Sequence, residues 1–247
     1  MTRLRRAAAS AGQASDRDSV APVRQPPNDD SVASTRQVTS RDAVVAARAG
    51  EARHFVTDRR RFGLSVDELV ACAVNAIRAG VDVIQVRERD LPDGQLVGLV
   101  RRIVVLAAGT RTRVTVNDRA DVAIAAGAAG VHLRGDSLSA SRVREFAPEG
   151  FVIGRSVHSL PDVDAAIAGA GCDYLLFGTV FPSAGKPGGH PVAGLDALGA
   201  ACARSSLPVI AIGGITDEHA ALVRDAGAAG FAAVGLFMCL TPLPVVV

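Results

Sequence analysis

The sequence predicts an α/β protein with a (β/α)8 TIM barrel, whose last helix is missing and whose N-terminal extension is disordered. Three observations lead to this fold. From residue 54 onward, eight short β-branched or apolar runs alternate with Ala-rich stretches of helical character. Most runs are apolar throughout, which is typical of parallel strands that helices cover. Ala-Gly pairs end four of the helical stretches directly before the next run. A doubly wound open sheet is the alternative.

Length and composition limit the class of protein. The chain has 247 residues, which allows one or two domains. Its hydrophobic fraction of 49% excludes global disorder, and its net charge of +2 argues against nucleic-acid binding driven by charge. Four cysteines without metal-ligand spacing fit the reduced, buried thiols of a cytoplasmic protein; they are Cys72, Cys172, Cys202 and Cys239.

Two segments precede the predicted barrel. Residues 1–37 lack apolar periodicity and are rich in Arg, Ser, Ala, Asp and Pro, so we expect a disordered tail. Residues 38–53 are expected to form a short helical lead-in, in which Thr39 or Ser40 caps a helix that ends at Gly50. The TIM barrel is expected over residues 54–247.

The strands follow one another at regular spacing, each with room for a returning helix. Glycine ends four of these helices because it adopts a left-handed conformation without strain; the glycines are Gly80, Gly127, Gly171 and Gly227. The eight strands are expected at residues 54–58, 81–87, 113–118, 130–133, 151–156, 172–178, 207–214 and 229–236.

The chain ends soon after the eighth strand. Pro242 and Pro244 forbid a long helix there, so the eighth helix is expected to be missing. A seam between the last and first strands would then need a partner subunit or the predicted helix at 40–50 to cover it. Residues 226–247 are uncharged, but their glycines and prolines favour a buried strand and a coil over a membrane span.

Polar or glycine residues follow all eight predicted strands. Active sites of TIM barrels lie at the carboxyl ends of the strands, so these residues predict where the chemistry occurs. They are Asp58, Gln85, Arg87, Asn117, Asp118, His132, Arg134, Ser156, His158, Gly178, Thr179, Gly213, Gly214 and Gly235.

Two pairs among them indicate specific chemistry. His158 has the best position for proton transfer, with Ser156 to orient it, whereas His132 is expected in the barrel wall. His158 can also simply begin the next helix. Asn117 and Asp118 suit a Mg²⁺ ion or a hydrogen-bonded substrate ring, although Asp118 can equally cap a helix.

Two further segments indicate phosphate binding. Residues 179–194 form a long loop rich in Gly and Pro that carries Ser183 and Lys186, the single lysine among 27 basic residues. TIM barrels commonly bind phosphate through backbone N–H groups after the seventh and eighth strands, which here end at Gly213, Gly214, Val234 and Gly235.

Five ordered motifs resemble those of the thiamine-phosphate synthase superfamily. They are QVRER, VNDRADVAIAAGAAGVHL, IGRSVHS, DYLLFGTVFPSAGK and PVIAIGGIT. The superfamily comprises the synthase and its relative, the TenI-type thiazole tautomerase, and the resemblance covers residues 54–237. It implies a TIM-barrel enzyme of thiamine (vitamin B1) biosynthesis.

For the synthase, the resemblance implies a complete substrate site. That enzyme joins a pyrimidine pyrophosphate to a thiazole phosphate with Mg²⁺ and releases pyrophosphate. The implied residues are Gln85, Arg87 and Asn117 for the pyrimidine pyrophosphate, Asp118 for Mg²⁺, Ser183 and Lys186 for pyrophosphate, and Gly213, Gly214, Val234 and Gly235 for the thiazole phosphate.

The chain departs from the synthase pattern at the pyrophosphate subsite. Residues 134–137 read Arg-Gly-Asp-Ser instead of Gly-Gln-Glu-Asp, so Ser137 stands where the synthase has its second Mg²⁺ ligand. Asp136 substitutes for that ligand only through a one-residue shift. Arg89 replaces a lysine, and Gly185 replaces a hydroxyl residue. Loss of a carboxylate weakens a metal clamp.

These departures favour the tautomerase, an isomerase that needs no metal or other cofactor. His158, assisted by Ser156, would move the proton that aromatises a thiazole carboxylate phosphate. The alternative is the Mg²⁺-dependent synthase, a transferase, with Asp118 and Asp136 as the metal ligands. Its pyrophosphate subsite would include Arg89 and Arg134.

A third hypothesis belongs to a different class, a catalytically weak phosphate-binding or regulatory relative. All three predict a phosphorylated thiazole as partner, and the synthase adds a pyrimidine pyrophosphate. None predicts a nucleic acid or a membrane as partner, and a homo-oligomer is compatible with each.

Overall fold

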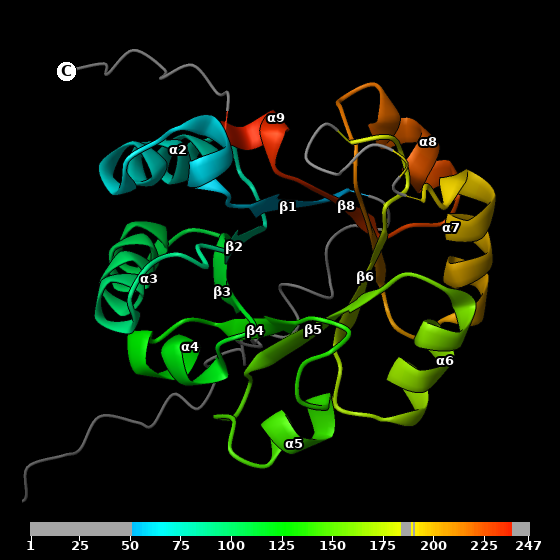
Figure 1. Cartoon of the computed structure of the whole chain (residues 1–247), viewed down its shortest axis with the longest axis horizontal. Helices are drawn as coiled ribbons and strands as arrows, with labels where there is room; N and C mark the ends of the chain where they lie inside the picture. The colour runs from blue at the N-terminus through cyan, green and yellow to red at the C-terminus, as the bar shows by residue number, and fades with distance from the viewer. Residues whose placement is uncertain (1–50, 184–188, 190, 239–247) are drawn as a thin grey trace, which may run out of the picture. The chain divides into compact units, whose positions relative to one another are not determined.

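Eight parallel strands close into a barrel in which each strand pairs with its neighbours in sequence and β1 pairs with β8. This computed structural model describes residues 51–183, 189 and 191–238. The barrel confirms the predicted fold class, and Figure 1 shows the ring of strands. The strands are β1 (Ala52–Val56), β2 (Val83–Val86), β3 (Arg113–Asn117), β4 (Gly130–Leu133), β5 (Val152–Val157), β6 (Tyr174–Gly178), β7 (Val209–Ile212) and β8 (Gly230–Ala233).

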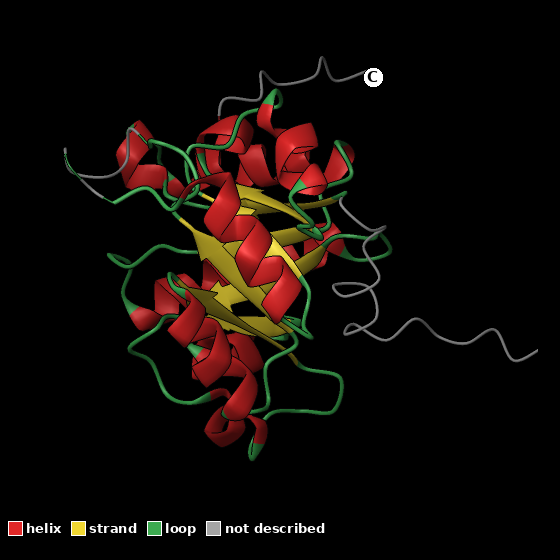
Figure 2. Cartoon of the chain, turned by 90° about the vertical axis from the view of Figure 1, so that its right-hand side faces the viewer, coloured by secondary structure: helices red, strands yellow, loops and turns green. Residues whose placement is uncertain are grey.

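Helices surround the strands, as Figure 2 shows. Local signals place several of their ends. Ser65 begins the first long helix with a capping box, because its side chain accepts the backbone N–H of Glu68 while the Glu68 carboxylate accepts that of Ser65. The helices are η1 (Arg59–Phe62), α2 (Val66–Arg78), α3 (Asp93–Ala107), α4 (Ala120–Ala126), α5 (Ala140–Arg144), α6 (Leu160–Ala168), α7 (Gly194–Arg204), α8 (His219–Asp225) and α9 (Gly235–Met238).

Left-handed glycines turn four helices into strands, as the sequence predicts. Their φ angles are +70° at Gly80, +71° at Gly127, +85° at Gly171 and +92° at Gly227. At Gly171 the approach is also close, because a Cβ there would lie 2.8 Å from the backbone nitrogen of Ser141. Each glycine thus brings the chain directly from a helix into a buried strand.

A single turn of helix follows the eighth strand, where the sequence predicted that a helix would be missing. In α9, Phe237 and Met238 are buried, and the Phe237 ring lies 5.6 Å from that of Phe55 on β1. The same ring lies 6.5 Å from that of Phe231 on β8. This short helix therefore covers the seam between β1 and β8.

The remaining predictions for the ends of the chain fall outside the described residues. They are the tail at 1–37, the helix at 40–50 and the segment that contains Cys239. Strand β1 begins at Ala52, two residues before the predicted start of the barrel. No helix in the described part of the chain has the length and apolar character needed to cross a membrane.

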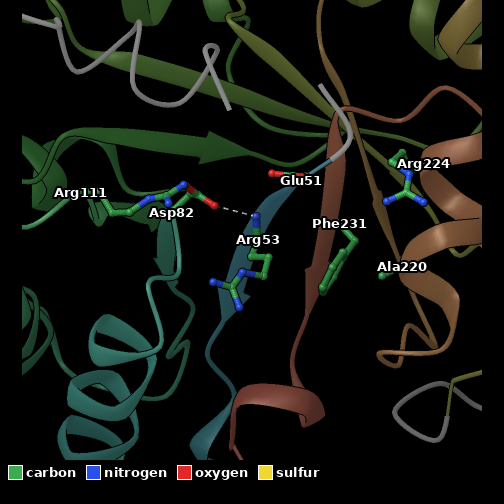
Figure 3. Close-up of a pocket in the computed structure, with 7 residues that line it drawn as sticks. All are labelled: Glu51, Arg53, Asp82, Arg111, Ala220, Arg224 and Phe231. Carbon is green, nitrogen blue, oxygen red and sulfur yellow. Dashed lines mark hydrogen bonds and ion pairs between the residues drawn. The ribbon is translucent and has the colours of Figure 1, made fainter. Parts of the chain in front are cut away.

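Two buried carboxylates hydrogen-bond to backbone N–H groups at the amino ends of neighbouring strands. Asp82, next to β2, accepts the backbone N–H of Arg53 at 2.9 Å, and it also pairs with the Arg111 guanidinium. Figure 3 shows the Asp82 carboxylate directed at the backbone nitrogen of Arg53. Both residues line a hollow of about 310 Å³. Asp173, next to β6, accepts the N–H of Ile153 at 2.8 Å.

Replacing Asp173 by alanine is expected to lower the free energy of unfolding by about 3 kcal/mol, because it leaves the buried N–H of Ile153 without its acceptor and removes the carboxylate partner of the partly buried Arg144. The Asp173 carboxylate is fully buried and lies 2.7 Å from Arg144 Nη2. Denaturant unfolding measures the change. Asp164→Ala, which removes an exposed pair with Arg204, is the control and should leave the midpoint unchanged. Equal effects of the two substitutions would contradict this role.

Candidate active site

A cavity of about 810 Å³ lies at the carboxyl ends of the strands, and residues that follow all eight strands line it. Most predicted site residues belong to its lining: Gln85, Arg87, Arg89, Asn117, Arg134, Asp136, Ser156, His158, Ser183, Gly213, Gly214, Val234 and Gly235. Asp118 does not line the cavity but contacts residues that do. Lys186 lies outside the described residues.

Polar side chains from β2 and β3 pair with each other on the floor of the cavity. The Gln85 amide donates to Asn117 Oδ1 at 3.3 Å, and Gln85 is almost fully buried. Arg87 extends toward the first strand, where its Nη1 lies 3.1 Å from Asp58 Oδ2. The paired amides present fixed donors and acceptors that suit a flat heterocyclic ring.

Arg134 bridges two carboxylates at the rim of the cavity. Its Nε donates to Asp136 Oδ1 at 2.8 Å, and its Nη1 lies 3.8 Å from Asp118 Oδ2. The Ser137 hydroxyl donates to the other oxygen of Asp118. The φ angle of Asp118 is +65°, unusual for a residue with a side chain, and its N–H donates to His132 O at 2.8 Å. Both carboxylates are therefore already engaged by a cation.

This arrangement does not fit the Mg²⁺ site that the resemblance implies. Mg²⁺ takes carboxylate, phosphate and water oxygens in a strict octahedron. Asp118 and Asp136 hold Arg134 instead, and the described residues contain no cluster of three or more potential metal ligands. We therefore derive no reaction step through a metal.

Arg89 is a third guanidinium of the cavity lining, beside Arg87 and Arg134. Burial, together with the like charges of Arg87 and Arg134, lowers the pKa of its guanidinium. Within the described ranges, no ion pair with a carboxylate is formed by Arg89, whereas Arg87 and Arg134 both form one. An anionic group of a ligand would supply the missing counter-charge.

His158 presents a proton acceptor to the cavity. Its Nδ1 contacts the carbonyl oxygen of Gly178, and its backbone N–H donates to Asp162 at 2.9 Å. Because a carbonyl oxygen only accepts, Nδ1 carries the hydrogen, which leaves Nε2 with a free lone pair in the neutral ring. This tautomer suits a general base.

Two glycines after β7 allow the backbone to approach the cavity. The φ angles are +104° at Gly213 and +65° at Gly214. A Cβ at Gly213 would lie 2.5 Å from Thr179 Cγ2, and one at Gly214 would lie 2.2 Å from the carbonyl oxygen of Pro182. Together with Gly235 after β8, they expose backbone N–H groups of the kind that hold phosphate in TIM barrels.

The substitution Gly214→Ala is expected to weaken binding of inorganic phosphate by about tenfold or more. Alanine is strained at this φ angle, and its Cβ overlaps the backbone of Phe181 and Pro182, so the loop must move. Isothermal titration calorimetry measures the affinity. Gly199→Ala within α7, where a Cβ meets nothing closer than 3.6 Å, is the control and should bind as the unaltered chain does. Unchanged affinity in Gly214→Ala would argue against a phosphate site here.

The structure adds residues that the sequence analysis missed. Arg61 and Thr216 line the cavity; the run of three arginines directly after the first strand was the available signal for Arg61. His132 was assigned to the barrel wall, which is wrong. It lies in the barrel interior, 1% exposed, with Nε2 at 2.8 Å from Ser156 Oγ. The neighbours of His132 in GVHL are apolar on both sides, so alternation gave no indication of its direction.

Known proteins are similar to this chain in sequence and in fold. A family model described as "Thiamine monophosphate synthase" matches residues 53–237. The thiamine-phosphate synthase of Anaeromyxobacter dehalogenans is 42% identical over 160 residues, which cover 65% of this chain and 71% of that protein. The thiamine-phosphate synthase of Methanoculleus marisnigri is 42% identical over 161 residues, covering 64% and 75%.

Solved structures also resemble this chain. Thiamine phosphate pyrophosphorylase from Pyrococcus furiosus superposes with a TM-score of 0.67 at 31% identity, covering 79% of this chain and 91% of that one. A 3-hexulose-6-phosphate synthase superposes with a TM-score of 0.56 at 18% identity, covering 75% and 90%, which shows a shared fold alone.

Proposed function

The chain belongs to the thiamine monophosphate synthase family, and on this premise we propose that it joins a pyrimidine pyrophosphate to a thiazole phosphate, forming thiamine phosphate. The observation that carries the proposal is the 42% identity to proteins named thiamine-phosphate synthase. The sequence alone favours the tautomerase over this reaction. The relatives favour the synthase.

The geometry of the cavity supports a substrate pair with two anionic ends. Guanidinium groups gather after β2 and β4, and backbone N–H groups gather after β7 and β8, across the closed barrel. The Gln85–Asn117 pair lies on the β2–β3 side and can orient the pyrimidine ring. Pyrophosphate is a leaving group that needs dense positive charge, which Arg87, Arg89 and Arg134 supply from this chain.

The test is direct synthesis by the purified full chain. We expect thiamine phosphate and pyrophosphate to appear when both substrates and Mg²⁺ are supplied, and chromatography detects both products. Arg89→Gln is expected to raise the KM for the pyrimidine pyrophosphate about tenfold, since a charge-assisted contact is lost. Arg60→Gln is the matched control, because Arg60 is exposed and does not line the cavity. Absence of product from folded protein would overturn the proposal.

A second candidate function is the thiazole tautomerase. Two observations favour it: the free Nε2 of His158 at the cavity, and the engagement of Asp118 and Asp136 by Arg134. Tautomerisation moves a proton and needs neither a leaving group nor a metal to neutralise one. The products separate the two reactions, because synthesis consumes the pyrimidine pyrophosphate and releases pyrophosphate, whereas tautomerisation converts the thiazole carboxylate phosphate alone.

A further inference from the structure

A chain of buried hydrogen bonds runs from the barrel interior to the floor of the cavity. The phenol oxygen of Tyr174 lies 3.2 Å from His132 Nδ1, and His132 Nε2 lies 2.8 Å from Ser156 Oγ. Tyr174 is 0% exposed and His132 is 1% exposed. Ser156 lines the cavity. These hydrogen bonds thus join a fully buried side chain to one that lines the cavity.

The sheet is built to allow this contact between strands that are not neighbours. Gly154 on β5 pairs with His132 on β4 and with Tyr174 on β6. A Cβ at Gly154 would lie 2.1 Å from Tyr174 Cζ and 2.4 Å from its hydroxyl oxygen. The missing side chain at Gly154 therefore opens the space through which the Tyr174 phenol crosses one strand to reach His132.

Burial fixes the protonation state of both groups. It lowers the pKa of His132 to about 3, with smaller contributions from His54 and Arg155, and it raises the pKa of Tyr174 well above its usual range. At neutral pH the imidazole is therefore uncharged and the phenol keeps its proton. An uncharged imidazole has one N–H donor and one lone-pair acceptor, so its two hydrogen bonds must run in the same direction along the chain.

We propose that Tyr174 and His132 are positioning residues that direct the Ser156 hydroxyl proton into the cavity, toward an oxygen or nitrogen acceptor of the substrate. The phenol is more acidic than the serine hydroxyl and is the better donor to Nδ1. The His132 hydrogen then lies on Nε2 and is donated to Ser156 Oγ. Ser156 keeps its own O–H free for the ligand. This proposal rests on the proposed function, since the acceptor belongs to the phosphorylated substrate bound there.

The direction in which the hydrogen bonds from Tyr174 through His132 to Ser156 run can be measured without any substrate. Full-length protein labelled with ¹⁵N-histidine reports which ring nitrogen of His132 carries the hydrogen, and a His132→Gln sample assigns the signal. We expect hydrogen on Nε2 and none on Nδ1 between pH 6 and 8. Hydrogen on Nδ1 would mean that Ser156 donates to the imidazole, and would overturn the proposal whether or not the chain makes thiamine phosphate.

A double-mutant cycle tests whether Tyr174 affects catalysis through Ser156. We expect Tyr174→Phe and Ser156→Ala each to lower kcat for thiamine phosphate about tenfold, with little change in KM, and the double variant to lose no more than Ser156→Ala alone. Losses that multiply would assign Tyr174 a purely structural role and overturn the proposal.

Two substitutions at His132 provide a matched control. The amide nitrogen of Gln reaches the position of Nε2 and can still donate to Ser156, whereas the shorter Asn replaces Nδ1 and cannot. We expect His132→Gln to retain much more kcat than His132→Asn, and the reverse order would contradict the assignment. If the unaltered chain makes no thiamine phosphate, the proposed function fails, and the ¹⁵N measurement alone decides the positioning.

Discussion

Acidification from pH 7.5 to pH 5 is expected to lower the free energy of unfolding by about 4 kcal/mol, because two buried histidines cannot accept protons in the folded chain. Burial lowers the pKa of His54 to about 4 and that of His132 to about 3. Above pH 6.5 both histidines are neutral in the folded and unfolded states, so their contribution to stability is complete. Below pH 6.5 the unfolded chain binds protons and gains stability.

The free energy of unfolding should fall by up to about 1.4 kcal/mol per pH unit for each histidine. The decrease should end as the pH falls through the pKa values of the folded chain, about 4 for His54 and about 3 for His132. Denaturant unfolding at half-unit steps from pH 7.5 to 5 measures the slope. Carboxylates titrate mostly below this window. His132→Gln should remove half of the slope. A flat profile between pH 6.5 and 5 would show that the two rings are not buried as described.

The substitution His158→Ala is expected to slow thiazole tautomerisation by roughly 10²–10⁴-fold, the usual contribution of a positioned general base. The Nδ1 contact with Gly178 leaves Nε2 free to take the proton. The same variant should lower thiamine-phosphate formation less than tenfold, because replacing pyrophosphate by the thiazole nitrogen transfers no proton. Chromatographic assays of both reactions on one preparation measure the two effects.

The two assays also separate the candidate functions from each other. If the unaltered chain catalyses tautomerisation in the presence of a chelator and His158→Ala greatly lowers that rate, the chain is a tautomerase. Synthesis that survives His158→Ala would establish the synthase. If the unaltered chain is inactive in both assays but binds thiazole phosphate, it is a binding relative.

Much of the fold could be predicted from the chain alone. Local signals specify it: each strand is a short apolar run, and each left-handed glycine, such as Gly80, marks where a helix ends. The location of the cavity also followed, because a parallel barrel brings all carboxyl strand ends to one face. Residue types at these ends were therefore enough to predict which side chains would gather around the cavity.

The contacts within the site could not be predicted, because they depend on register between strands. Nothing in the residues 134–137 reveals that Arg134 pairs with Asp136 and approaches Asp118 from another loop. Likewise, the contact of Tyr174 with His132 requires knowing that Gly154 lies between them. Such relations arise only once the sheet has closed.

The two buried carboxylates stabilise the barrel at the amino ends of the strands, whereas the cavity lies at their carboxyl ends. Asp82 and Asp173 each follow a left-handed glycine by two residues, and they lie four strands apart, on opposite sides of the ring. Closure is thus secured at two points remote from the cavity. Residues at the other end are free to change during evolution without opening the ring. The Arg134–Asp136 pair lies at that other end, where a change of residues alters the chemistry and leaves the architecture intact.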